Sequence, residues 1–295
     1  MSTQRPPTID PAAAARWAAR VPEASPWLHE EVARRMEERL EWIVKKPTQW
    51  LHWEPLQGGL QAHALLTKRY PESRVFVLES GADKAQAAHK RIAKPWWNAA
   101  AWSTPKTFYA KPERPVQMLW ANMALHMAAD PQALIAQWHR LVDVDGFLMF
   151  SCLGPDTLRE LRPLYAEFGW PPPTHTFTDM HDWGDMLVGQ GFAEPVMDME
   201  RITLSFSTPQ TLLAELRGLG RNLHAGRFAG LRGRDWLAKL HAGLAQIAAK
   251  SQDGRLQLSF EVIYGHAFKP PARLGVAPET RVSLDEMRKA LSQRK

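Results

Sequence analysis

The sequence predicts an α/β fold in which a parallel sheet is covered by helices. Short apolar segments alternate with helical patterns along most of the 295 residues, and this order produces parallel strands joined by crossover helices. The apolar segments are nearly continuous in hydrophobic character, as expected of strands that are buried on both faces. A helical segment interrupted by glycines then precedes one final strand, which alternates in polarity.

The first element expected is an amphipathic helix over Ser25–Val44. Ser25 can cap its first turn, and Pro26 is compatible with the start of a helix. Apolar side chains recur at helical spacing between glutamates and arginines that would face solvent. The preceding residues, 1–25, are rich in Pro and Ala and are expected to form a flexible N-terminal arm.

Strands and helices then alternate, apart from an irregular segment at 94–106. Strands are expected at 48–53, 74–80, 107–110, 115–122, 143–154, 193–207 and 255–269. Helices are expected between them at 61–70, 83–93, 130–142, 155–169 and 177–192. Asp130 and Asp179 are expected to cap the helices that begin at or near them. A helical lid of about 207–252 precedes the last strand, so one domain spans 26–270 and a C-terminal tail covers 271–295.

Composition and charge restrict the class of protein. Hydrophobic residues make up 45% and charged residues 23% of the chain, which is ordinary for a soluble globular protein. No apolar run approaches the roughly 18 residues that span a bilayer, and the start of the chain lacks the pattern of a signal peptide. The single cysteine, Cys152, lies in an apolar strand and allows no internal disulfide. We therefore expect a cytoplasmic protein that does not bind a membrane.

The net charge of +6 favours an acidic partner, although such an excess also serves solubility alone. Nucleic acid is not the expected partner, because no base-reading motif follows the fourth strand, where the chain reads WANM. The histidines have no metal-ligand spacing, so no metal site is expected.

Several segments between residues 115 and 269 carry a specific combination of motifs. They read VQMLWANMALHM, DGFLMFSCLGPDTLREL, LRGLGRNLHAGR and FEVIYGHAF. This combination resembles the malonyl-acyl carrier protein (ACP) O-methyltransferases of biotin biosynthesis (BioC). The resemblance implies a class I methyltransferase fold: a Rossmann-like seven-stranded sheet with helices on both faces and a helical lid before the last strand. It also implies methyl transfer from S-adenosyl-L-methionine (SAM) to the free carboxylate of malonyl-ACP or malonyl-CoA.

The SAM-binding loop departs from the family pattern within WLHWEPLQGG. The resemblance places His52 where an acid ends the first strand. It places Glu54 and Leu56 where glycines would let the cofactor approach the backbone. Only Gly58 matches a family glycine, and Gly59 adds a second flexible position. Gly58 and Gly59 are therefore the candidate cofactor-binding residues of a degenerate loop.

Three further side chains are candidates for the cofactor site by the same resemblance. Glu79 ends the second strand, where the family holds both ribose hydroxyls with a carboxylate. Trp120 and Asn122 would line the cofactor mouth at the fourth strand. Gln117 and Met127 replace an Asp and a Trp of the family pattern. The alternative reading of Glu79 is an exposed residue at a strand end.

The lid is rich in basic residues. They are Arg217, Arg221, His224, Arg227, Arg232 and Arg234. The resemblance implies that the lid covers the malonyl group, and Arg227 is the candidate catalytic residue because a guanidinium binds a carboxylate in bidentate fashion. The other arginines would dock the acidic carrier or form a solvated helix face. A carboxylate is already a nucleophile at neutral pH, so the reaction needs no general base.

Two alternatives remain open, the first because of the altered loop and the second because the resemblance extends to another branch of this fold. The chain could be a pseudoenzyme that has lost SAM binding and serves as a binding protein for ACP or another partner. It could also belong to the hydroxylase branch of this fold, which acts on a protein arginine during assembly of a respiratory complex. Binding of SAM separates a methyltransferase from the first alternative, and a need for ACP separates it from the second.

Overall fold

A computed structural model describes residues 9–93, 106–249, 251 and 253–272. The irregular segment expected at 94–106 lies almost entirely outside these residues, as does most of the expected C-terminal tail. Each predicted strand and helix is present in the described part of the chain, in the predicted order.

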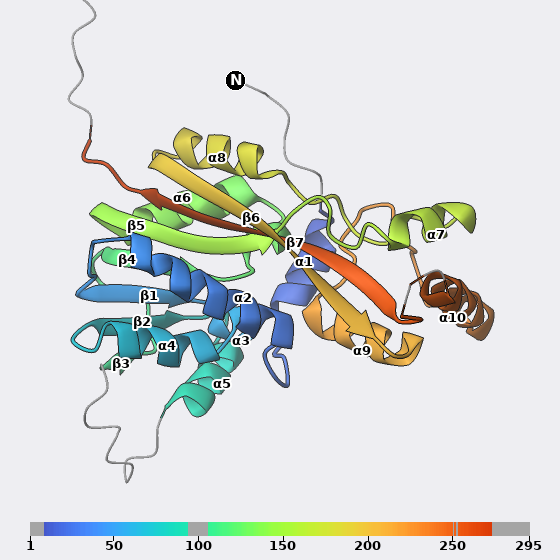
Figure 1. The fold of residues 1–295 in the computed structure, drawn as a ribbon. Coiled ribbons are helices and arrows are strands. Elements are labelled where there is room, and N and C mark those ends of the chain that lie inside the picture. Colours follow the sequence, from blue (N-terminus) through green and yellow to red (C-terminus); the bar gives the residue numbers. More distant parts are fainter. Residues whose placement is uncertain (1–8, 94–105, 250, 252, 273–295) are drawn as a thin grey trace, which may run out of the picture.

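Seven strands form one sheet in the order β3-β2-β1-β4-β5-β7-β6 (Figure 1). The strands are β1 (Gln49–Trp53), β2 (Arg74–Leu78), β3 (Thr107–Phe108), β4 (Val116–Ala121), β5 (Val142–Leu153), β6 (Ala193–Phe206) and β7 (Leu256–Phe268). Strands β1 to β5 pair in parallel, whereas β7 is antiparallel to both β5 and β6. The end of β6 and the start of β7 pair directly, so the lid is an insertion at the connection between two antiparallel neighbours. The predicted α/β fold with seven strands is therefore confirmed.

Helices cover both faces of the sheet (Figure 1). Side chains alternate along each strand, so Trp50 and Met118 pack toward α2 and α4, whereas Leu51 and Leu119 pack toward α6 and α8. The helices are α1 (Pro11–Ala18), α2 (Trp27–Glu38), η1 (Arg39–Trp42), α3 (Pro55–Gly58), α4 (Gln61–Arg69), α5 (Ala82–Ile92), η3 (Leu125–Met127), α6 (Pro131–Leu141), α7 (Leu161–Glu167), α8 (Met180–Gly189), α9 (Pro209–Leu219) and α10 (Arg234–Ala249). None of the helices in the described ranges is both long enough and apolar enough to cross a membrane.

Three helix starts were expected to have side-chain caps, and the prediction for Ser25 is wrong. Asp179 accepts a hydrogen bond from His181 N at 2.8 Å, which confirms its role at α8. Helix α2 has Pro26 in the cap position and receives no side-chain cap bond. Ser25 Oγ instead accepts from Leu60 N at 3.3 Å, so this hydroxyl connects the start of α2 to the start of α4.

The lid consists of α9 and α10, which lie beside the outer ends of the long strands β6 and β7 (Figure 1). Part of the expected arm packs against the lid as helix α1. Asp10 N donates to Leu223 O at 2.9 Å, and Ile9 is buried against Leu223. The structure therefore differs from the expected flexible arm over residues 9–18, because the apolar face of α1 finds a partner in the lid.

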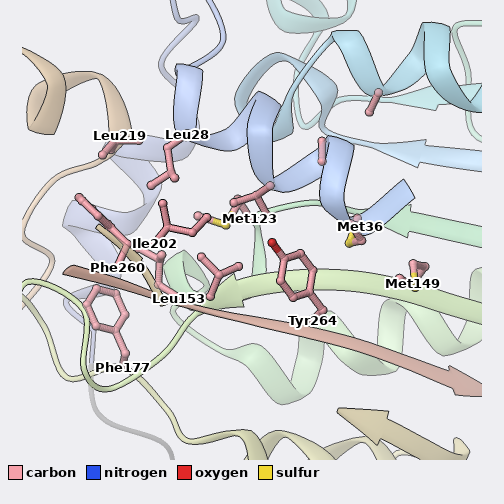
Figure 2. Close-up of a cluster of buried hydrophobic side chains, with 14 of the residues drawn as sticks. Leu28, Met36, Met123, Met149, Leu153, Phe177, Ile202, Leu219, Phe260 and Tyr264 are labelled. Carbon is pink, nitrogen blue, oxygen red and sulfur yellow. The ribbon is translucent and has the colours of Figure 1, made fainter. Parts of the chain in front are cut away.

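One hydrophobic cluster connects the lid, the sheet and α2 (Figure 2). Leu28 and Met36 extend from α2, Phe260 and Tyr264 extend from β7, and Leu219 extends from the end of α9. None of these side chains is more than 8% exposed. The end of α9 is therefore anchored in the same core as the central sheet.

Candidate functional site

A cavity of about 180 Å³ lies at the carboxyl ends of β1 and β4. Doubly wound sheets bind ligands at this edge, where the strand order changes direction. Trp53 and Glu54 line it at the end of β1, and Asn122 and Met123 line it at the end of β4. Leu219 lines it on the side of the lid, and α1 and α2 supply further wall. This is the edge of the sheet at which the sequence places the cofactor candidates.

The loop between β1 and α4 contains the short helical turn α3. Glu54 precedes this turn with φ of 45°, and Gly59 follows it with φ of 117°, a backbone conformation that favours glycine. A Cβ atom on Gly58 would lie 2.7 Å from the backbone oxygen of Asn122. Both candidate glycines are therefore required by the conformation of the loop and by its close packing on the end of β4.

The side chain of Asn122 is buried, and both of its polar atoms have partners. Nδ2 donates to the backbone oxygen of His29 at 2.8 Å and to that of Gly58. Oδ1 accepts from Ser151 Oγ at 2.5 Å. Asn122 therefore connects α2, α3 and β5 at the cavity wall.

The carboxylate of Glu79, after β2, is turned toward the α3 loop. Its side chain is fully buried, and Oε1 accepts a hydrogen bond from Leu56 N at 2.9 Å. Oε2 lies 3.4 Å from Lys84 Nζ and has no hydrogen-bond donor among the described residues. Burial raises the pKa of Glu79, and the Leu56 amide and Lys84 partly oppose this rise. The alternative of an exposed residue at a strand end is therefore wrong.

Leu56 and His52, which stand where the family pattern has a glycine and an acid, are buried inside the protein. Leu56 is fully buried and packs against β2 and α5. The ring of His52 stacks on that of His63 with centroids 5.9 Å apart, and burial holds the pKa of His52 well below its usual range. Leu56, His52 and Glu79 do not line the cavity. The α3 turn thus covers the Glu79 carboxylate in this structure.

The other two candidates lie away from this cavity. Trp120 is fully buried in the core on the α2 side of the sheet. Arg227 lies in the loop after α9, where its Nη2 is 2.6 Å from Asp10 Oδ2 and its Nη1 donates to His224 O at 3.0 Å. The guanidinium expected to hold a malonyl carboxylate therefore already holds the carboxylate of Asp10.

His29 is a cavity residue that the sequence analysis missed. Its Nδ1 lies 2.6 Å from Gln57 O, and its Nε2 has no partner among the described residues. A carbonyl oxygen only accepts hydrogen bonds, so Nδ1 carries the hydrogen and Nε2 presents a lone pair. Burial lowers the pKa of His29 to about 4, so the ring is neutral near pH 7. In the sequence, only its position next to Leu28, in the apolar stripe of α2, indicated that His29 faces the interior.

Solved structures share the fold of this chain at low sequence identity. No family model matches the chain. A candidate methyltransferase from Bacillus halodurans has a TM-score of 0.53 and 14% identity, and the match covers 81% of this chain and 99% of that one. The YcgJ protein from Bacillus subtilis has a TM-score of 0.51 and 11% identity, and the match covers 82% and 99% of the two chains. These likenesses confirm the predicted class I methyltransferase fold.

Relatives with higher identity agree in name. The malonyl-[acyl-carrier protein] O-methyltransferase of Laribacter hongkongensis is 37% identical over 254 residues, which cover 83% of this chain and 84% of the relative. That of Gallionella capsiferriformans is 37% identical over 273 residues, which cover 85% and 87% of the two chains. These relatives give no support to the hydroxylase or binding-protein alternatives. The chain belongs to the malonyl-[acyl-carrier protein] O-methyltransferase family.

Proposed function

We propose that this chain transfers a methyl group from SAM to the free carboxylate of a malonyl group carried by ACP, in the cytoplasm, as a step of biotin synthesis. The observation that supports this most is 37% identity to two proteins named for that reaction, over more than four fifths of each chain. Methyl esterification removes the negative charge of the carboxylate. The product then resembles an uncharged acyl chain.

The residue types at the carboxyl edge of the sheet fit SAM, with one obstacle. Glu79 Oε2 is a buried acceptor without a donor among the described residues, and a ribose hydroxyl is a donor that would satisfy it. Gly58, Gly59 and Asn122 would hold the rest of the cofactor beside the cavity. The obstacle is the Leu56 amide, which occupies Glu79 Oε1. Binding of SAM therefore requires α3 to move away from Glu79.

Bound SAM would supply an electrophilic methyl group, and the residues of the chain would orient the reactants and exclude water. Orientation alone lowers a barrier of this kind by about 7–11 kcal/mol. Trp53 and Met123 give the cavity apolar walls, and His29 Nε2 offers an acceptor to a hydroxyl or ammonium group of a ligand. The malonyl carboxylate attacks without a general base, so the neutral state of His29 is compatible with this reaction.

The carrier would dock on the lid. Arg217, Arg221 and Arg232 are exposed, and none of them forms an ion pair with another described residue. Unpaired surface cations attract an acidic partner over distances of about a Debye length. Arg227 would bind the malonyl carboxylate by exchanging Asp10 for it.

Calorimetric titration of the purified chain with SAM and with S-adenosylhomocysteine tests this function. We expect a Kd on the order of micromolar, weakened by about tenfold or more in Glu79→Gln. Glu72→Gln is the matched control, because Glu72 is exposed shortly before β2 and should not affect binding. Mass spectrometry of malonyl-ACP after incubation with SAM then detects the methyl ester. No binding at millimolar SAM would refute the proposed function.

A further inference from the structure

A second cavity, of about 230 Å³, lies beneath the lid. Residues of α7, α9, α10 and β7 line it, and ten of the lining residues are leucines. A malonyl group is short and charged, so it would leave most of these apolar walls in contact with water. A ligand with an apolar chain would cover these walls and exclude water from them.

The volume of this cavity indicates the length of such a chain. An apolar cavity of about 150 Å³ lined by Leu, Ile and Phe binds benzene, which has six carbons. By the same proportion, 230 Å³ accommodates about eight to ten carbons. This is the size of a medium-length acyl chain.

Three arginines are among the residues that line the lid cavity. Arg217, Arg221 and Arg232 line it, and Arg221 and Arg232 also line an adjoining basic cavity of about 400 Å³. Arg16 and Arg20 of the α1 region line this basic cavity as well. None of these five guanidinium groups forms an ion pair with another described residue.

Aromatic rings, and not carboxylates, lie against three of these arginines, Arg20, Arg221 and Arg232. The guanidinium carbon of Arg221 is 5.4 Å from the centroid of a Trp17 ring, and that of Arg232 is 4.2 Å from a Trp236 ring. Burial, together with the like charges of its arginine neighbours, lowers the pKa of Arg221. Positive charge without a counter-ion beside an apolar cavity points to an amphiphilic anion.

We propose that the lid cavity binds a saturated acyl chain of about eight to ten carbons, whose anionic head group lies against Arg221 and Arg232. This inference goes beyond methylation of a malonyl group and requires no cofactor. Met127 and Leu219 line both the lid cavity and the cavity at the ends of β1 and β4. A bound chain would therefore lie next to the proposed methyl-transfer site. A free fatty acid and an acyl thioester with a phosphate-bearing arm share this chemistry.

Calorimetric titrations of the full chain, without SAM, test the proposal with decanoate, decanol and malonate. We expect decanoate to bind about tenfold or more tightly than either decanol or malonate. Leu216→Trp fills the cavity from α9 and should weaken decanoate binding by about tenfold or more. Arg221→Gln should remove the preference for decanoate over decanol. Arg234→Gln is the matched control, because Arg234 is an exposed lid arginine that lines neither cavity.

Tighter binding of decanoyl-CoA than of decanoate would identify an acyl thioester as the ligand of the lid cavity. The reverse order would identify a free fatty acid as the ligand. Equal affinities for malonate and decanoate would overturn the proposal, as would decanoate binding that survives both substitutions. If Leu216→Trp does not fold, Leu213→Phe fills the cavity from the preceding turn of α9. Because SAM is absent from these titrations, failure of the proposed methyl transfer leaves their result unchanged, and a failure here does not affect the titration with SAM.

Discussion

Lys84 is the cation beside the buried Glu79 carboxylate, and Lys84→Met should therefore lower the free energy of unfolding. Nζ lies 3.4 Å from Glu79 Oε2 and 3.6 Å from Glu54 Oε2, and the Lys84 side chain is 3% exposed. Removal of one partner from a buried ion pair costs about 3–5 kcal/mol, because the remaining charge has no compensation. Both distances exceed that of a direct hydrogen bond, so we expect the lower end, about 3 kcal/mol.

The loss of stability in Lys84→Met should depend on pH through the protonation of Glu79. Burial already raises the pKa of this carboxyl group above 4.5, and loss of Lys84 raises it further. A raised carboxyl pKa means that the folded state binds the proton more tightly than the unfolded state. Stability is then greatest below the unfolded pKa and falls as the pH rises through the folded pKa. The difference between Lys84→Met and the wild type should therefore be larger at about pH 8 than at about pH 5.

Urea unfolding followed by tryptophan fluorescence at both pH values measures this difference. Lys90→Met is the matched control, since Lys90 is exposed on the same helix, α5, and should have little effect. The double variant Glu79→Gln/Lys84→Met removes both charges and should recover most of the lost stability. An equal loss at the two pH values, or no recovery in the double variant, would refute the reasoning.

Three further predictions concern packing, the lid contact and the buried thiol. Gly58→Ala should lower the free energy of unfolding by about 1–3 kcal/mol in urea titrations, because its Cβ would lie 2.7 Å from a backbone oxygen. Gly184 lies on a helix with open space around it, so Gly184→Ala should raise the free energy of unfolding by about 0.5–1 kcal/mol. The hydrogen bond from Arg227 lowers the pKa of Asp10, so the contact between α1 and the lid should weaken as the pH falls through that lowered pKa, and hydrogen exchange of the α1 amides should accelerate there. Exchange that does not change with pH would contradict this. Burial raises the pKa of the Cys152 thiol, so iodoacetamide should label it in urea and not in the folded protein, as mass spectrometry can show.

Local pattern predicted most helices and strands of the described part of the chain, although not α1 or α3. The continuous apolar segments became the central strands, and Asp130 and Asp179 cap the helices that follow them. These features depend on residues that are near one another in the sequence. The cap expected from Ser25 is absent, because its hydroxyl bonds to Leu60, which lies 35 positions away.

Of the six candidate site residues, Gly58 and Asn122 line the cavity at the ends of β1 and β4. Glu79 and Asn122 were candidates because the family resemblance implies cofactor-binding residues at the ends of the second and fourth strands. Their hydrogen-bond partners could not be identified. Glu79 bonds to Leu56, 23 positions away, and Asn122 bonds to His29, 93 positions away.

The sequence by itself determined the order of the elements, the edge of the sheet at which a site is expected and the family to which the chain belongs. Periodicity, strand ends and motifs are properties of neighbouring residues, so they can be read without coordinates. Only the tertiary structure decided which polar groups are already satisfied within the protein. Arg227 binds Asp10 across 217 positions, and leucines from three separate helices form the wall of the lid cavity. These partners are brought together by the packing of whole helices and strands. No pattern of neighbouring residues predicts that packing.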